Sequence, residues 1–148
     1  MTFIANTIHR CLPYRWSATV IMVLLLDVST YMAFKESSGQ MLFPHQDKLM
    51  HLLGFMVLTT IGHLSLHWDV WPTLARRVST KKQRPSYLLT CLNWALWISY
   101  GVFIEAVQKL LSYRGASIED FLADVAGIIA GTFLVFALKL YPRSAETP

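Results

Sequence analysis

The chain has 148 residues, of which 54% are hydrophobic and 15% are charged, and its formal net charge is +4. This balance is more apolar than that of soluble globular proteins and favours one small integral membrane domain over residues 1–148. The basic residues form neither an amphipathic basic face nor a known binding motif, which argues against a nucleic-acid partner.

Four apolar segments approach the roughly 20 residues that cross a bilayer. They cover approximately residues 16–34, 49–66, 87–107 and 121–141. We therefore predict an all-α polytopic membrane protein, a compact bundle of four transmembrane helices. No small-residue cleavage site follows the first segment, so we expect it to remain as a span. Asp27 lies deep in this span and is predicted to be neutral, paired or turned toward the bundle.

The basic residues are sorted by loop. Nine of the 13 Lys and Arg lie in the two terminal flanks and in the loop between the second and third spans. The remaining four, Lys35, Lys48, Lys109 and Arg114, lie toward the opposite side. The positive-inside rule then predicts that both termini are cytoplasmic and that the first and third loops are external.

Polar residues gather at the external ends of the second, third and fourth spans. Residues three or four apart share a helix face, so each span presents its polar side chains together. Ionisable groups are costly near hydrocarbon and usually mark a site or a structural network. The predicted ligand-binding residues are Asp47, Lys48, His51, Glu105, Gln108, Arg114, Asp120 and Asp124.

Three interpretations of this cluster remain open from the residues alone. Lys48 and Arg114 neutralise the acids and hold the helix ends together, or they bind an anionic lipid head group or phosphate. Alternatively, Glu105 and His51 are candidate catalytic residues of a general acid/base or divalent-metal site. No nucleophile elbow, thiol pair, P-loop or zinc motif accompanies them, so we assign no metal and no cofactor and favour a binding protein over an enzyme.

The fourth span carries two further local signals. Ser117 and Asp120 have the spacing of a capping box before an apolar run. Gly127 and Gly131 form a small-xxx-small pattern, which allows another helix to pack closely. Elsewhere, polar residues such as Asn93 are expected to form hydrogen bonds between helices rather than to carry chemistry.

The polar motifs, taken together, resemble the VanZ-like family of small bacterial membrane proteins. They are Asp47-Lys48-Leu49-Met50-His51, Glu105-Ala106-Val107-Gln108, Arg114, Asp120 and Gly127. The family has a D-K-x-x-H block, an E-x-x-Q block, a loop Arg and a D-x-x-x-N-x-x-G block, and the resemblance covers the second to fourth spans. This sequence departs at Asp124, where the family usually has Asn, and an amide-donor role there is lost.

The resemblance implies a multi-pass protein of the bacterial cytoplasmic (inner) membrane. The family is named for a protein associated with low-level resistance to the glycopeptide teicoplanin. We therefore expect binding of a membrane lipid or lipid-linked envelope precursor, with an effect on the response to envelope-directed antibiotics. The alternatives are an enzyme acting on a lipid-linked substrate through Glu105 and His51, or a structural subunit that docks on a membrane protein through its Gly127/Gly131 face.

Overall fold

The computed structural model describes residues 16–35, 43–70, 86–111, 117–138 and 140. This part of the chain contains four α-helices, each long and apolar enough to span a membrane. They are α2 (Ser17–Phe34), α3 (Gln46–Leu64), α5 (Ser86–Leu110) and α6 (Ile118–Ala137), and α3 continues into a π-helix, η1 (Ser65–Val70). The predicted all-α fold with four transmembrane helices is confirmed.

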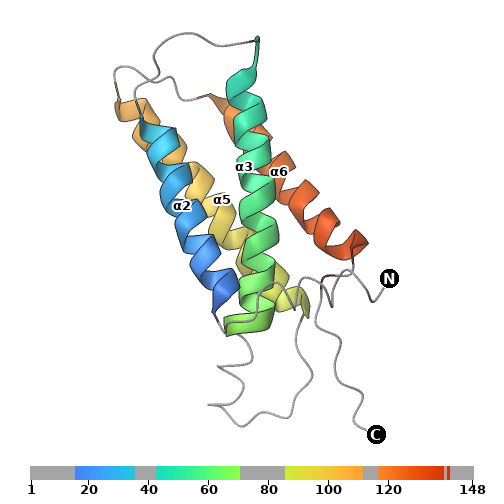
Figure 1. Cartoon of the computed structure of the whole chain (residues 1–148). Helices are drawn as coiled ribbons and strands as arrows, with labels where there is room; N and C mark the ends of the chain where they lie inside the picture. The colour runs from blue at the N-terminus through green and yellow to red at the C-terminus, as the bar shows by residue number, and fades with distance from the viewer. Residues whose placement is uncertain (1–15, 36–42, 71–85, 112–116, 139, 141–148) are drawn as a thin grey trace, which may run out of the picture.

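Successive helices run in opposite directions, so α2 and α5 end where α3 and α6 begin (Figure 1). We call this end of the bundle, at the top of Figure 1, the polar end. The predicted site residues on α3, α5 and α6 all lie within the two turns nearest to it. Antiparallel connection of the helices therefore brings together polar groups that are up to 77 positions apart in the sequence, as in Asp47 and Asp124.

α3 packs more closely against α6 than against any other helix of the described bundle. A Cβ atom added at Gly127 would overlap the backbone oxygen of Leu52, and one at Gly131 would overlap that of Met56. Small residues let two helix backbones approach and gain dispersion contacts, which drive helix association in lipid. The small-residue face of α6 is thus occupied by α3 of the same chain.

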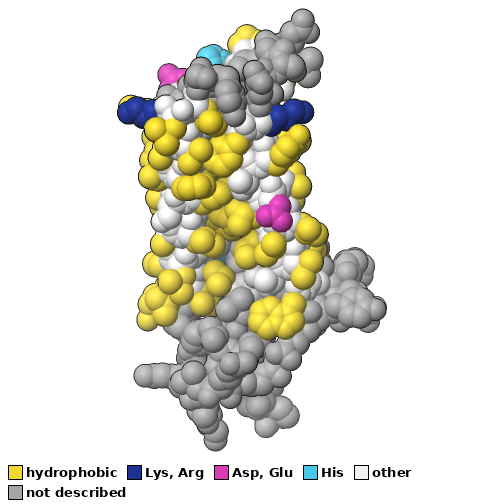
Figure 2. Space-filling model, turned by 90° about the vertical axis from the view of Figure 1, so that its left-hand side faces the viewer, with side chains coloured by type: hydrophobic (Ala, Val, Ile, Leu, Met, Phe, Trp, Pro, Cys, Tyr) yellow, Lys and Arg dark blue, Asp and Glu magenta, His cyan; other side chains and the backbone are white. Residues whose placement is uncertain are grey.

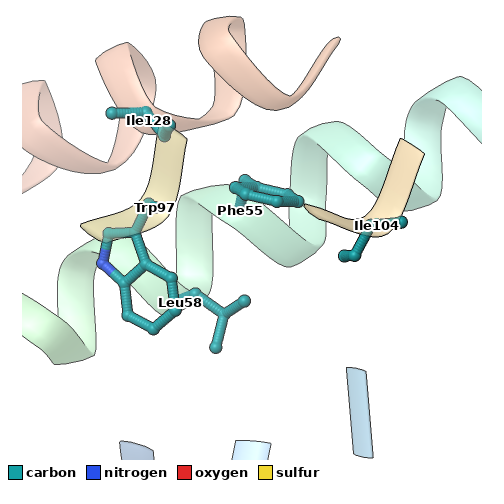
Figure 3. Packing of buried hydrophobic residues seen from close by; sticks show 5 residues of the cluster. All are labelled: Phe55, Leu58, Trp97, Ile104 and Ile128. Carbon is teal, nitrogen blue, oxygen red and sulfur yellow. The ribbon is translucent and has the colours of Figure 1, made fainter. Parts of the chain in front are cut away.

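An apolar core joins three helices in the middle of the bundle. It consists of Phe55 and Leu58 of α3, Trp97 and Ile104 of α5, and Ile128 of α6, each at most 3% exposed (Figure 3). Close packing of such side chains leaves little freedom for one helix to turn against another. The core therefore determines which faces of α3, α5 and α6 meet at the polar end.

A hydrogen-bond network crosses between α3 and α5 on the other side of this core. Asn93, fully buried, donates from Nδ2 to the carbonyl oxygen of Thr59 over 3.0 Å. Its Oδ1 accepts a 2.8 Å hydrogen bond from Trp97 Nε1. The predicted hydrogen bond between helices is confirmed by the contact of Asn93 with Thr59, and the bond from Trp97 lies within α5.

α2 covers the bundle loosely and contributes only Ala18 to the buried residues. Its exposed surface is largely apolar, and Figure 2 shows hydrophobic side chains (yellow) over the middle of the bundle. One acidic side chain (magenta) lies among them. Asp27 is exposed on this helix. Of the three alternatives predicted for Asp27, the structure excludes the one in which it turns toward the bundle, because the packed face of α2 is formed by other residues.

Candidate functional site

Lys48 connects the first turns of α3 with the first turn of α6. Its Nζ lies 3.0 Å from Glu119 Oε2, 3.2 Å from Asp120 Oδ1 and 3.8 Å from Asp47 Oδ2. Asp120 is 5% exposed, so its buried carboxylate oxygens require polar partners. Lys48 is thus surrounded by carboxylates and ties α3 to α6.

His51 and Asp124 form a second contact between these helices. His51 Nδ1 lies 2.8 Å from Asp124 Oδ1, and Asp124 is 1% exposed. The carboxylate has room because residue 101 of α5 is a glycine: a Cβ atom there would lie 2.9 Å from Asp124 Oδ2. Gly101 therefore allows an acidic side chain of α6 to lie against the backbone of α5.

Glu105 of α5 reaches the start of α6. Its Oε2 accepts a 2.9 Å hydrogen bond from the backbone N–H of Ser117, while the Ser117 hydroxyl accepts one of 3.1 Å from the N–H of Glu119. Ser117 caps α6 as predicted. In the expected capping box, the Asp120 side chain would accept the backbone N–H of Ser117, but here Glu105 accepts it. Asp120 does not accept it because its carboxylate is paired with Lys48.

Three of these side chains converge on one point. One ligand atom from each of His51, Glu105 and Asp124 lies within 4.8 Å of the other two. Asp124 Oδ2 and Glu105 Oε1 are buried, and neither has a hydrogen-bond partner among the described residues. One imidazole and two carboxylates in this arrangement can hold a divalent cation or transfer a proton.

A cavity of about 360 Å³ opens beside this group, between α2, α3 and α5. His51 lines it, and so do Asp47 and Gln108. Gln108 is 2% exposed, and its Nε2 donates over 3.0 Å to the carbonyl oxygen of Ala33, in the last turn of α2. Most of the remaining wall is apolar, formed by Val28, Met32, Ala33, Met50, Phe55, Leu58 and Ile104.

The eight predicted site residues thus divide into groups. Lys48 contacts Asp47 and Asp120, whereas His51, Glu105 and Asp124 form the converging group. Gln108 belongs to the cavity wall beside His51 and Asp47. Arg114 lies outside the described residues.

Two residues at the site escaped the sequence analysis. Glu119 pairs with Lys48, and its only sequence signal was that it is an acid in the first turn of the fourth predicted helix. Gly101 makes room for Asp124, and it precedes Glu105 by four positions on α5. A small residue on the same helix face as a predicted site acid indicates that the side chain of a neighbouring helix can lie against that face.

No protein-family model matches this chain, no curated protein is significantly similar to it, and no solved structure matches it. The resemblance to the VanZ-like family stays a prediction that depends on the polar motifs.

Proposed function

We propose that this chain is a bacterial inner-membrane protein that binds a lipid or a lipid-linked cell-envelope component. The observation that carries the proposal is the 360 Å³ cavity, which has a mainly apolar wall and lies within the membrane-spanning part of the bundle. Its volume lies within the range of about 300 to 1,000 Å³ that is usual for small-molecule sites. An amphiphile matches such a cavity, because its chain contacts the apolar wall and its head reaches the polar end.

The chemistry of the polar end favours a head group that offers hydroxyl or amide hydrogens. The site at this end contains five acids and Lys48, and these six residues carry a formal charge of −4; the acids are Asp47, Glu105, Glu119, Asp120 and Asp124. Lys48 already contacts three carboxylates, so we assign it to the helix ends rather than to the ligand. Carboxylate, amide and imidazole groups are suited to the hydroxyls of a sugar head group.

At the level of the cell, we propose an effect on the response to envelope-directed antibiotics of the glycopeptide type. The support is the VanZ-like motif series together with the four spans. The loop charges support an orientation with both termini in the cytoplasm and the polar end outside. Deletion and complementation in the native host, scored as teicoplanin susceptibility, test this part of the proposal.

Native mass spectrometry of protein extracted gently from its host membrane tests ligand binding directly. Gly54 lines the cavity, and a Cβ atom there would meet no other atom within 4 Å, so Gly54→Leu should place its side chain in the space of the cavity. Ala106→Leu adds a side chain of the same size on the exposed surface of α5 and is the matched control.

We expect a lipid or lipid-linked mass on the wild-type protein and on Ala106→Leu, and a bare chain for Gly54→Leu. A bare chain in all three samples contradicts the proposal. An equal ligand load on all three also contradicts it, because that ligand would lie outside the cavity.

A second candidate function is an enzyme that acts on a lipid-linked substrate. The observation in its favour is the His51–Asp124 contact beside the cavity, because a carboxylate that orients an imidazole is the usual arrangement of a general base. In that case Glu105→Gln and His51→Gln retain the bound mass but stop its conversion to product. Retention of an unaltered ligand mass by the wild-type protein over time argues against this second function.

A further inference from the structure

Two carboxylate oxygens at the polar end have no hydrogen-bond partner among the described residues. Both Asp124 Oδ2 and Glu105 Oε1 are buried, and Asp124 as a whole is 1% exposed. A buried carboxylate oxygen without a partner is destabilising, and a native structure rarely holds two together without a reason. A cation between them supplies what both oxygens lack.

The two carboxylates are held in place by contacts that leave these oxygens available. Glu105 is fixed through its other oxygen, Oε2, which accepts the N–H of Ser117. Asp124 is fixed through Oδ1, which contacts His51 Nδ1, and Gly101 leaves space beside Oδ2. Three different helices thus preorganise one site, as strong metal binding requires.

We propose that His51, Glu105 and Asp124 bind one divalent transition-metal ion of the Zn²⁺ or Mn²⁺ type. One ligand atom of each residue lies within 4.8 Å of the others. Ligands at about 2.1 Å from an ion lie roughly 3 to 4.3 Å apart, so only a small contraction is needed.

The donor set determines the class of ion. Ca²⁺ and Mg²⁺ prefer oxygen ligands alone, whereas imidazole together with carboxylate suits Zn²⁺ and Mn²⁺. His51 lines the 360 Å³ cavity, so an ion at this site lies beside the cavity and can keep water as a further partner. The bound ion also offsets the negative charge of the two carboxylates that hold it.

The experiment measures metal binding by the purified full-length protein in detergent. The protein is stripped with a chelator, titrated with Zn²⁺ by calorimetry and then assayed for bound zinc after gel filtration. Asp124→Asn and Glu105→Gln each remove one anionic ligand with little change of shape. Glu119→Gln is the matched control, because it removes an acid of the same end that is 71% exposed and pairs with Lys48.

We expect one Zn²⁺ per chain for the wild type and for Glu119→Gln, and affinities at least about tenfold weaker for the two ligand variants. Co²⁺ titration adds a spectroscopic readout, since visible d–d bands should form in the wild type and disappear in Asp124→Asn. Circular dichroism of each metal-free variant verifies that the fold is retained.

Absence of stoichiometric Zn²⁺ and Mn²⁺ binding by the folded wild type overturns the proposal. Wild-type affinity in Asp124→Asn overturns it as well. Gly54→Leu keeps all three protein ligands of the ion, so this variant should lose the lipid mass and still bind Zn²⁺. Failure of one proposal is therefore distinguishable from failure of the other.

Discussion

The backbone N–H of Ser117, at the start of α6, donates a 2.9 Å hydrogen bond to Glu105 Oε2, near the end of α5. A helix start has N–H groups without partners inside the helix, and here an acid of the neighbouring helix accepts one of them. The other oxygen, Oε1, is buried without a hydrogen-bond partner among the described residues, and Glu105 offers a ligand atom within 4.8 Å of His51 and Asp124. One carboxylate thus serves both the fold and the candidate metal site.

Substitutions at Glu105 should separate these two roles. Glu105→Ala removes the acceptor for Ser117 and should lower the free energy of unfolding by about 1 to 2 kcal/mol. Glu105→Gln keeps a carbonyl oxygen for the hydrogen bond and should lose less stability while it weakens Zn²⁺ binding. Thermal unfolding in detergent compares the two; equal stability of the wild type and Glu105→Ala contradicts the capping role.

One substitution, Gly→Ala, should have opposite effects at two positions. At Gly54 the added methyl meets no atom within 4 Å, so gain of helix propensity should stabilise the protein by about 0.5 to 1 kcal/mol. At Gly127 the methyl meets the backbone of α3, and separation of α3 from α6 should cost about 1 to 3 kcal/mol. Unfolding midpoints of the pair in the same detergent check the difference in sign.

Gly101→Ala should impair the candidate site without removing any of its polar groups. Its methyl would lie 2.9 Å from Asp124 Oδ2, so the carboxylate must move away from its position beside His51. We expect Zn²⁺ affinity to fall roughly tenfold or more, as for changes that displace a metal ligand. Calorimetry measures the effect with Gly54→Ala as control, and unchanged affinity in Gly101→Ala contradicts the described placement of Asp124.

Loss of Lys48 should be partly compensated by loss of Asp120. Lys48→Met leaves the buried Asp120 carboxylate without its ammonium partner, and the melting temperature should fall. Adding Asp120→Asn removes the unpaired charge and should raise the melting temperature above that of Lys48→Met alone. Additive losses in the double variant would contradict a direct interaction between the two residues.

Zinc binding should weaken as the pH falls. Protons compete with the metal for imidazole and carboxylate, because each ligand binds the ion in its deprotonated form. We expect lower affinity at about pH 5.5 than at about pH 7.5, because a larger share of the ligand groups holds a proton at the lower pH. Calorimetry in buffers of different ionisation enthalpy should also report proton release. Constant affinity across this window would exclude His51 as a ligand.

Several features of this protein follow from the sequence by itself. Apolar segments of bilayer length can satisfy their backbone groups only as helices, and this determines the four spans. Antiparallel order then places Lys48, Glu105 and Asp120 at one end, because the depth of a residue depends on its position along its helix. Helical spacing likewise predicts that His51 and Asp47 share a face.

Only the tertiary structure decided which partners these residues have. The contacts depend on how each helix is rotated about its axis, and that rotation is determined by packing at Gly127, Gly131 and the core around Trp97. For this reason Asp120 pairs with Lys48 while Asp124 meets His51, although both acids lie on α6. The unpartnered oxygens of the metal site and the cavity beside it exist only once three helices have packed, since no single span contains either.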